Sequence, residues 1–209
     1  MRLLAAAALV GLSIYMAPWP TQVVDGRKVL KSKSGYQTVS LLDGGRTGLY
    51  YDYGEVIGRM RPEAKKVVLL GLGGGEMLRA ARRTLPDAEM VGVELSPLTA
   101  ALAKSEFHVD AFGVKVVVED AANYIDKVEP GSVDGLMVDV FDDINLPLYF
   151  RSPVFFRACH KALSPRGILV MNVFPVELGP EVVSAIAGAG FSKVASFRSG
   201  PNEVLVAER

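Results

Sequence analysis

The segment from residue 66 to residue 174 alternates between short apolar runs and stretches with helical spacing. The apolar runs are 66–72, 89–95, 114–120, 133–141 and 167–174. The stretches between them repeat their apolar residues with the period of a helix: 75–85, 97–107, 121–128 and 152–163. Continuous apolar strands that alternate with helices are typical of a parallel sheet covered on both faces. The pattern therefore predicts an α/β fold built on a mostly parallel sheet.

The end of the chain departs from this alternation. A helix is predicted at 180–190, and two strand-like segments, 191–199 and 202–209, flank Gly200-Pro201. Glycine and proline at that point are typical of the turn of an antiparallel hairpin. An open parallel sheet that finishes in an antiparallel hairpin resembles the plan of the class I transferases that use S-adenosylmethionine (AdoMet), which have a Rossmann-like fold.

The part of the chain before Pro62 has a different pattern. Residues 36–43 and 46–53 are predicted as short strands, with Gly44-Gly45 as the turn between them. We therefore predict three parts of the chain: an apolar N-terminal helix or anchor at 1–20, a small β element at 21–60, and a Rossmann-like nucleoside-binding transferase domain at 61–209.

Residues 3–18 form an uncharged, apolar run. Its length is marginal for a membrane span, and no small-residue cleavage site of a signal peptide follows it. Three interpretations stay open: contact with a membrane, packing on the domain or on a second subunit, and secretion. Four basic residues follow the run, Arg27, Lys28, Lys31 and Lys33, whereas Arg2 alone precedes it. If the run is an anchor, this positive-inside bias keeps the domain cytoplasmic.

Charge and reactive side chains exclude several classes of function. The 209 residues carry 23 basic and 23 acidic side chains, a balance that gives no electrostatic basis for binding nucleic acid. The single cysteine, Cys159, lies in an apolar helical stretch and is predicted to be a core residue. Two histidines, His108 and His160, are too few for a metal site, so no metal is predicted. The expected partner is a small molecule.

A cluster of glycines ends the first apolar run and opens the next helix; it consists of Gly71, Gly73, Gly74 and Gly75. Glycine lets a backbone turn tightly and approach a ligand closely. A dinucleotide-binding loop would require a further glycine at position 76, where this chain has Glu76. A carboxylate there repels a pyrophosphate but is compatible with a nucleoside that carries a positive sulfonium.

Acidic residues follow the next three apolar runs, at the edge where open parallel sheets bind their ligands. Glu94 is placed to accept hydrogen bonds from ribose hydroxyls, and Asp120 to accept one from an adenine amino group. Asp139 ends the strand-like part of the fourth run, and Asp142 and Asp143 follow it. The alternative for each acid is that it merely caps the following helix.

These motifs resemble those of the spermidine synthase family of polyamine aminopropyltransferases. The similar segments are 34–43, 67–81, 91–97, 116–125 and 135–174. The resemblance implies nucleoside contacts from the four loop glycines and from four further residues: Gln37, Glu94, Asp120 and Ala121. It also implies that Asp139 is the catalytic base, assisted by Asp142. The co-substrate would then be decarboxylated AdoMet, whose aminopropyl group passes to an amine while methylthioadenosine leaves.

Two departures from the family pattern leave alternatives open. The family has an aspartate where this chain has Gly74, and the segment before the glycine loop is shorter, with residues 50–55 as candidates to replace it. The resemblance favours aminopropyl transfer to a polyamine. Loss of the aspartate instead fits AdoMet itself, whose carboxylate an aspartate would repel, and hence a methyltransferase with an unknown acceptor.

A third alternative is a nucleoside-binding module without catalysis. Relatives of the family are often dimers, so a homodimer contact through the apolar N-terminal run is a further hypothesis.

Overall fold

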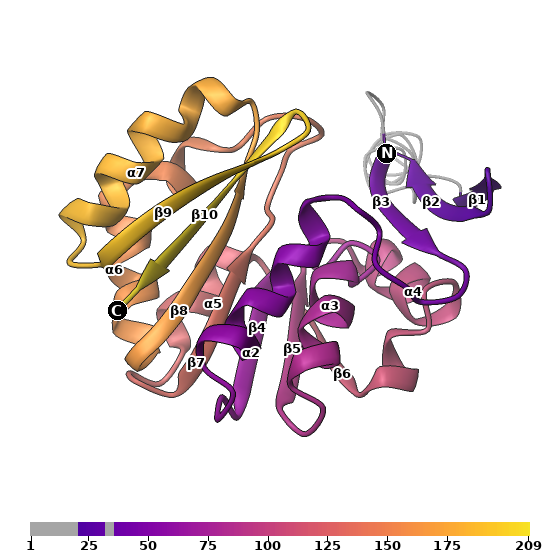
Figure 1. The fold of residues 1–209 in the computed structure, drawn as a ribbon, viewed down its shortest axis with the longest axis horizontal. Coiled ribbons are helices and arrows are strands. Elements are labelled where there is room, and N and C mark those ends of the chain that lie inside the picture. The colour runs from indigo at the N-terminus through magenta and orange to yellow at the C-terminus, as the bar shows by residue number, and fades with distance from the viewer. Residues whose placement is uncertain (1–20, 32–35) are drawn as a thin grey trace, which may run out of the picture.

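A computed structural model of the chain describes residues 21–31 and 36–209, and these form two sheets (Figure 1). The larger sheet has seven strands in the order β6-β5-β4-β7-β8-β10-β9. Their bounds are β4 Lys66–Leu70, β5 Glu89–Glu94, β6 Val114–Val118, β7 Val133–Val138, β8 Leu163–Val173, β9 Ser192–Ser199 and β10 Asn202–Glu208. The first five are parallel, and β9 and β10 form an antiparallel hairpin that pairs with β8. The predicted α/β fold with its closing hairpin is confirmed.

Helices cover both faces of this sheet because alternate side chains of each buried strand point in opposite directions. In β4, Val67 and Leu69 pack with one set of helices, whereas Val68 and Leu70 pack with the other. The first set, here called the α2–α4 face, contains α2 Glu55–Met60, α3 Glu76–Thr84 and α4 Pro97–Ser105. The second set, the α5–α7 face, contains α5 Ala121–Lys127, α6 Pro153–Ala162 and α7 Gly179–Gly188.

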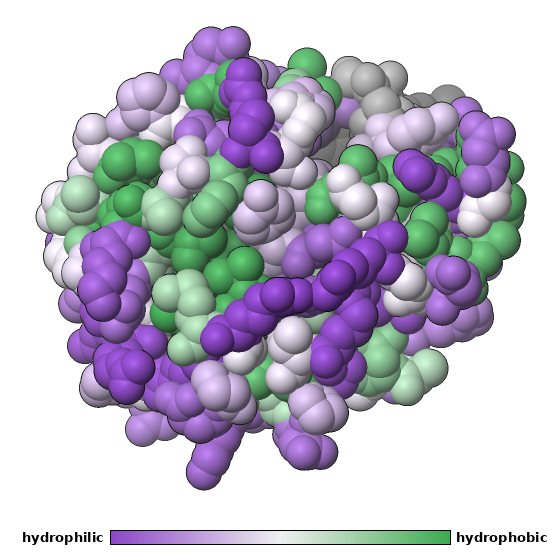
Figure 2. All heavy atoms as spheres, in the orientation of Figure 1, coloured by the Kyte–Doolittle hydropathy of each residue, from purple (hydrophilic) through white to green (hydrophobic). Residues whose placement is uncertain are grey.

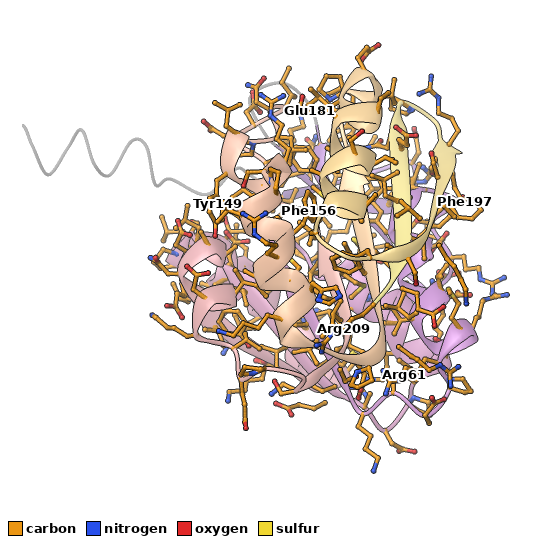
Figure 3. The ribbon with its side chains drawn as sticks, turned by 90° about the vertical axis from the view of Figure 1, so that its left-hand side faces the viewer. Arg61, Tyr149, Phe156, Glu181, Phe197 and Arg209 are labelled. Atoms are coloured by element: carbon orange, nitrogen blue, oxygen red, sulfur yellow. The ribbon has the colours of Figure 1, made fainter. Side chains whose placement is uncertain are left out.

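The α5–α7 face is shown from the side in Figure 3, where Phe156 and Tyr149 mark α6 and the turn before it. Helix α6 begins at Pro153, and the Oγ atom of Ser152 accepts a hydrogen bond from the amide of Phe155 at 3.3 Å. Cys159 in this helix is fully buried, as expected for a core residue. Short 3-10 helices complete the chain: η1 Tyr50–Gly54, η2 Val109–Phe112, η3 Leu148–Arg151 and η4 Val176–Leu178.

The smaller sheet is antiparallel and precedes the larger one in the chain. Its strands are β1 Thr21–Val24, β2 Arg27–Lys31 and β3 Tyr36–Leu41. Only β3 was predicted. The signal for β1 and β2 was the Asp25-Gly26 pair, whose φ angles of +48° and +72° belong to the tight turn that joins antiparallel strands.

The predicted strand at 46–53 is wrong, because this segment forms a loop and the 3-10 helix η1. The Asp52 carboxylate accepts hydrogen bonds from the amides of Thr47 and Gly48 at 3.2 and 2.7 Å. These bonds fold the segment back on itself, and the ring of Tyr51 is buried against the larger sheet. The Gly44-Gly45 turn therefore leads from β3 into η1 and not into a second strand.

Helix α2 follows η1 directly and packs on the larger sheet. Its Ile57 lies over Gly135 in β7, where an added Cβ atom would be 2.6 Å from the Cγ2 atom of Ile57. A glycine in the middle of the strand thus makes room for the helix. Figure 2 shows the surface on this side, with hydrophilic side chains across its middle and hydrophobic ones gathered to either side.

Within the described ranges, no helix has the length and apolar character that crossing a bilayer requires. The apolar run 3–18 lies outside these ranges, so the expectations attached to it stay predictions.

Candidate functional site

The glycine cluster lies at the carboxyl edge of the larger sheet, defined here as the edge where β4, β5, β6 and β7 end. The amides of Gly71 and Leu72 donate to the carbonyl oxygen of Val93 at 3.0 and 2.9 Å. Gly71 has φ +84°, and a Cβ atom on it would be 2.2 Å from the carbonyl oxygen of Asp139. Glycine at this position therefore lets the ends of β4 and β7 meet.

The next two glycines are held by side chains from other elements. The amide of Gly73 donates to Glu94 Oε2 at 3.1 Å, and the amide of Gly74 donates to Thr38 Oγ1 at 2.9 Å. A Cβ atom at Gly74 would be 2.5 Å from Thr38 Cγ2 and 2.8 Å from Phe107 Cδ1. Position 74 thus has no room for any side chain, because β3 packs directly on the loop.

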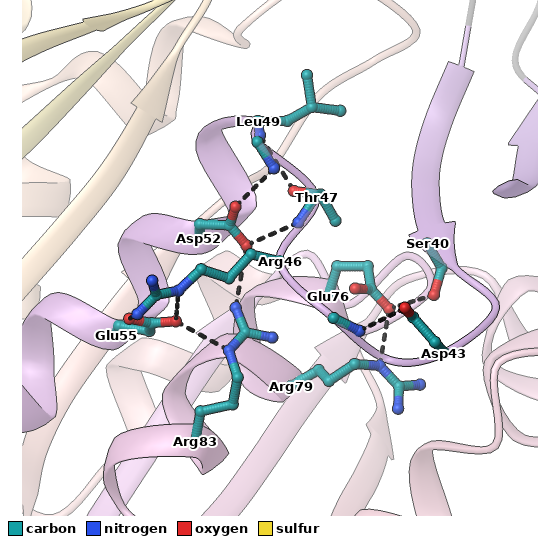
Figure 4. Close-up of polar contacts among 12 residues, drawn as sticks. Ser40, Asp43, Arg46, Thr47, Leu49, Asp52, Glu55, Glu76, Arg79 and Arg83 are labelled. Atoms are coloured by element: carbon teal, nitrogen blue, oxygen red, sulfur yellow. Dashed lines mark hydrogen bonds and ion pairs between the residues drawn. The ribbon is translucent and has the colours of Figure 1, made fainter.

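Strand β3 is joined to the loop at a second point. Ser40 Oγ donates to Glu76 Oε1 at 2.7 Å, and Arg79 Nε donates to the same oxygen at 2.9 Å (Figure 4). Glu76 is 3% exposed, and its burial raises the pKa of its carboxyl. A buried carboxyl group at the first turn of α3 occupies the place where a dinucleotide-binding loop holds pyrophosphate. The expectation that this loop does not bind pyrophosphate stays a prediction.

Glu94 stands at the end of β5. Its two carboxylate oxygens accept hydrogen bonds from backbone amides, Oε2 from Gly73 and Oε1 from Ser96 at 3.0 Å. Burial raises the pKa of the Glu94 carboxyl, and the backbone hydrogen bonds oppose that rise. The side chain is therefore oriented by the loop and has acceptor capacity left on both oxygens, as the ribose role requires.

Asp120 caps α5. Its Oδ1 atom accepts hydrogen bonds from the amides of Ala122 at 2.7 Å and Asn123 at 3.4 Å. The helix-cap alternative thus holds for this acid, while Oδ2 forms no hydrogen bond to any described residue. Ala121 is buried as the first residue of the helix. Gln37 is exposed, and its carbonyl oxygen accepts from the hydroxyl of Tyr51 at 3.4 Å. The nucleoside contacts of these three residues stay predictions.

Asp139 follows β7, and its amide continues the sheet by donating to the carbonyl oxygen of Leu70 at 2.8 Å. Its carboxylate accepts two hydrogen bonds, from the hydroxyl of Tyr50 to Oδ2 at 3.0 Å and from Asn172 Nδ2 to Oδ1 at 2.8 Å. Burial raises the pKa of Asp139 to about 6, against the opposing effect of these two bonds. The residue as a whole keeps part of its surface exposed.

The sequence offered Tyr50 only as one of several candidates in 50–55, without a place in the site, and it did not reveal Asn172. They lie 89 and 33 positions from Asp139 along the chain. A polar residue in the otherwise apolar run of β8 is the one signal that marked Asn172.

Asp142 lies apart from this cluster. It is exposed, and its backbone forms a tight bridge with Asn145 through hydrogen bonds of 2.9 and 3.0 Å. Its assisting role stays a prediction. No group of acidic, histidine or cysteine side chains suited to a metal ion occurs in residues 21–31 and 36–209.

Known proteins are similar to this chain in sequence and in fold. A family model described as a methyltransferase domain matches residues 68–171. The polyamine aminopropyltransferase of Chromobacterium violaceum is 36% identical over 112 residues, which cover 53% of this chain and 42% of that protein. The chain thus spans less than half the length of this curated relative.

Two solved structures extend the comparison. A probable spermidine synthase from Corynebacterium glutamicum superposes with a TM-score of 0.77 at 23% identity, covering 90% of this chain and 75% of that one. Human methyltransferase-like protein 13 in complex with SAH gives a TM-score of 0.62 at 21% identity, covering 76% and 79%.

The parallel sheet, its closing hairpin and the glycine loop define the class I AdoMet-transferase fold. Within that fold, the chain is similar in sequence to a polyamine aminopropyltransferase over about half of its length, and similar in fold to a probable spermidine synthase.

Proposed function

We propose that this chain binds decarboxylated AdoMet at its carboxyl edge and transfers the aminopropyl group to a small amine, a polyamine in the first instance. The observation that carries the proposal is Asp139, a carboxylate whose pKa is raised by burial and whose partners are the uncharged donors Tyr50 and Asn172. The similarity to polyamine aminopropyltransferases supports the choice of reaction.

The proposed reaction is a displacement at carbon. The acceptor nitrogen attacks the carbon of the aminopropyl group that is bonded to the sulfonium, the carbon–sulfur bond breaks, and its electron pair returns to sulfur. Neutral methylthioadenosine leaves, and the acceptor nitrogen must lose one proton. Asp139 takes that proton and anchors the amine before the attack. The rest of the rate enhancement comes from holding the two reactants in line.

Each residue of the site has a part in this proposal. Glu94 holds the ribose hydroxyls, and the glycine loop lets the nucleoside approach the backbone. Glu94 and Asp139 are both carboxylates without a cationic partner among the described residues. A site with this charge suits a positive sulfonium and a positive amine.

One observation favours a second candidate function, transfer of the methyl group of AdoMet. Position 74 holds glycine, and a Cβ atom there would crowd Thr38 and Phe107, so the loop lacks the aspartate that would pair with the amino end of an aminopropyl group. AdoMet carries a carboxylate at that end, which such an aspartate would repel.

Calorimetric titration with AdoMet, decarboxylated AdoMet and methylthioadenosine, side by side, separates the candidates. Tighter binding of decarboxylated AdoMet, followed by methylthioadenosine release when putrescine or spermidine is added, is the expected result. Tighter binding of AdoMet would overturn the aminopropyl proposal in favour of methyl transfer. If none of the three bound, the enzyme proposal would fall.

A further inference from the structure

Asp139 is one end of a row of hydrogen-bonded side chains that reaches the C-terminal hairpin. Asn202 Nδ2 donates to Asn172 Oδ1 at 3.0 Å, and Asn172 Nδ2 donates to Asp139 Oδ1 at 2.8 Å. The two asparagines lie on one face of the sheet, because Asn172 pairs with Val204, two residues after Asn202. Figure 1 shows the hairpin turn at the same edge of the sheet as the end of β8.

The direction of these hydrogen bonds matters for Asp139. An asparagine amide has one accepting end and one donating end. Since Asn202 donates to the accepting end of Asn172, the donating end of Asn172 faces Asp139. A donor beside a carboxyl group favours its charged form, whereas an acceptor favours the form that holds a proton. Asn172 is 2% exposed, so water is poorly placed to substitute for either partner.

We infer that Asn202 is a positioning residue that acts through Asn172 to keep Asp139 in the charged, proton-accepting form. The role of Asp139 as a base rests on the proposed function, whereas the row of side chains does not. The hairpin thereby does more than close the sheet, because its first β10 residue determines which end of a buried amide faces the site.

The other groups that the described part of the chain presents to Asp139 do not carry positive charge. Tyr50 and Tyr51 present phenols from η1, and the glycine loop presents backbone at Gly71. On the β8 side, Asn172 supplies the hydrogen bond. A reversal of the Asn172 amide should therefore change the pKa of Asp139 directly.

The variant N202D is expected to reverse the direction of the hydrogen bonds between position 202, Asn172 and Asp139. Its carboxylate accepts from Asn172 Nδ2 and so turns Asn172 Oδ1 toward Asp139, which then favours a protonated carboxyl. Carboxyl carbon NMR of the ligand-free protein, with the Asp139 signal assigned from D139N, follows the titration directly. We expect the titration midpoint of Asp139 to rise by about one pH unit or more, a tenfold gain in proton affinity.

A new negative charge alone would also raise that midpoint, so S199D is the matched control. Ser199 pairs with Asn202 across the hairpin, which puts the new charge on the same face without replacing the donor to Asn172. N202A removes the donor without adding charge. We expect the shift to be clearly smaller in S199D than in N202D, and N202A to raise the midpoint to a lesser degree.

Equal shifts in N202D and S199D, or an unchanged midpoint in N202A, would overturn the inference. Because this readout needs no turnover, it is separate from the proposed function. If the protein transfers the aminopropyl group but the titration midpoint of Asp139 does not respond to substitutions at position 202, the inference fails and the proposed function stands. If the midpoint responds but no transfer is found, the proposed function fails and the inference stands.

Discussion

The carboxylates of Glu55 and Asp139 differ in the groups that surround them, although both belong to residues packed against the larger sheet. Glu55 is 4% exposed and accepts hydrogen bonds from three arginines, Arg46, Arg59 and Arg83, at 2.7 to 2.8 Å. Figure 4 shows the contacts with Arg46 and Arg83. Among residues 21–31 and 36–209, Asp139 accepts hydrogen bonds from one phenol and one amide. Glu55 is thus part of an ion-pair network, whereas Asp139 has no cationic partner in these ranges.

The pKa values of the two groups follow from these surroundings. Hydrogen bonds and charge from Arg46, together with the other two arginines, hold the pKa of Glu55 well below its ordinary value. Burial without a cation raises the pKa of Asp139 to about 6. A carboxylate paired with arginines is stabilising and inert, whereas one left with neutral donors is poised to exchange a proton near neutral pH.

The largest effect is expected from D139N. The amide cannot take a proton, so kcat for transfer should fall by about 10²-fold or more. Binding of methylthioadenosine, measured by calorimetry, should change little, since Glu94 and the glycine loop are intact. D87N, at an exposed acid that has no part in the proposed site, is the control and should keep most of the activity. Equal losses in the two variants would mean that Asp139 has no special role.

Replacing Glu55 should have the opposite effect: it should lower the stability of the fold and leave the transfer activity of the folded protein unchanged. E55Q leaves three arginines without their shared partner, and the partly exposed arginines can turn to water. The free energy of unfolding should therefore drop by about 2 kcal/mol in urea denaturation. E63Q, at an exposed acid, should change stability little. A stable E55Q with lost activity would contradict the comparison.

The pH dependence of stability should have opposite signs for the two carboxyl groups. The folded state binds a proton at Asp139 more tightly than the unfolded state, so this group makes stability fall as pH rises from about 4 to about 6. Glu55 contributes stability above its ordinary pKa and loses it as pH falls. Thermal melts of D139N should thus show a flatter or rising profile in that window, and those of E55Q a smaller loss in acid.

The closed position in the glycine loop allows a test of packing at the site. G74A puts a Cβ atom against Thr38 and Phe107, and should cost about 1–3 kcal/mol of unfolding free energy. The distorted loop should also weaken nucleoside binding. G188A is the matched control, since a Cβ atom there meets nothing within 4 Å. A G74A protein as stable as G188A would show that the loop adapts.

The smallest effect is expected from Y50F. Loss of the hydroxyl removes one donor that favours the charged Asp139, so the acid limb of the pH–rate profile should move to higher pH by about half a unit. The ring still packs on Tyr51, 4.1 Å away between centroids. Y53F is the control, because the Tyr53 hydroxyl forms no hydrogen bond to a described residue. A profile that moves equally in both variants would remove Tyr50 from the site.

Much of the larger sheet was predictable because its strands are apolar and its helices have clear caps and periods. The error at 46–53 arose because Leu49, Tyr51 and Tyr53 alternate like a strand, while the hydrogen bonds of Asp52 that decide the fold were invisible in the pattern. The absence of an aspartate at position 74 was visible in the sequence. Its physical cause, the packing of β3 on the loop, was not.

The sequence by itself determined the alternation of strands and helices, the glycine loop and the acids at the strand ends, since these depend on local periods and on short motifs. The tertiary structure alone decided which acid has an arginine and which has not. It brought Tyr50, Asn172 and Asn202 to Asp139 from distant parts of the chain. A pKa depends on burial and on neighbours within a few ångströms, and those neighbours come from folding and not from sequence order.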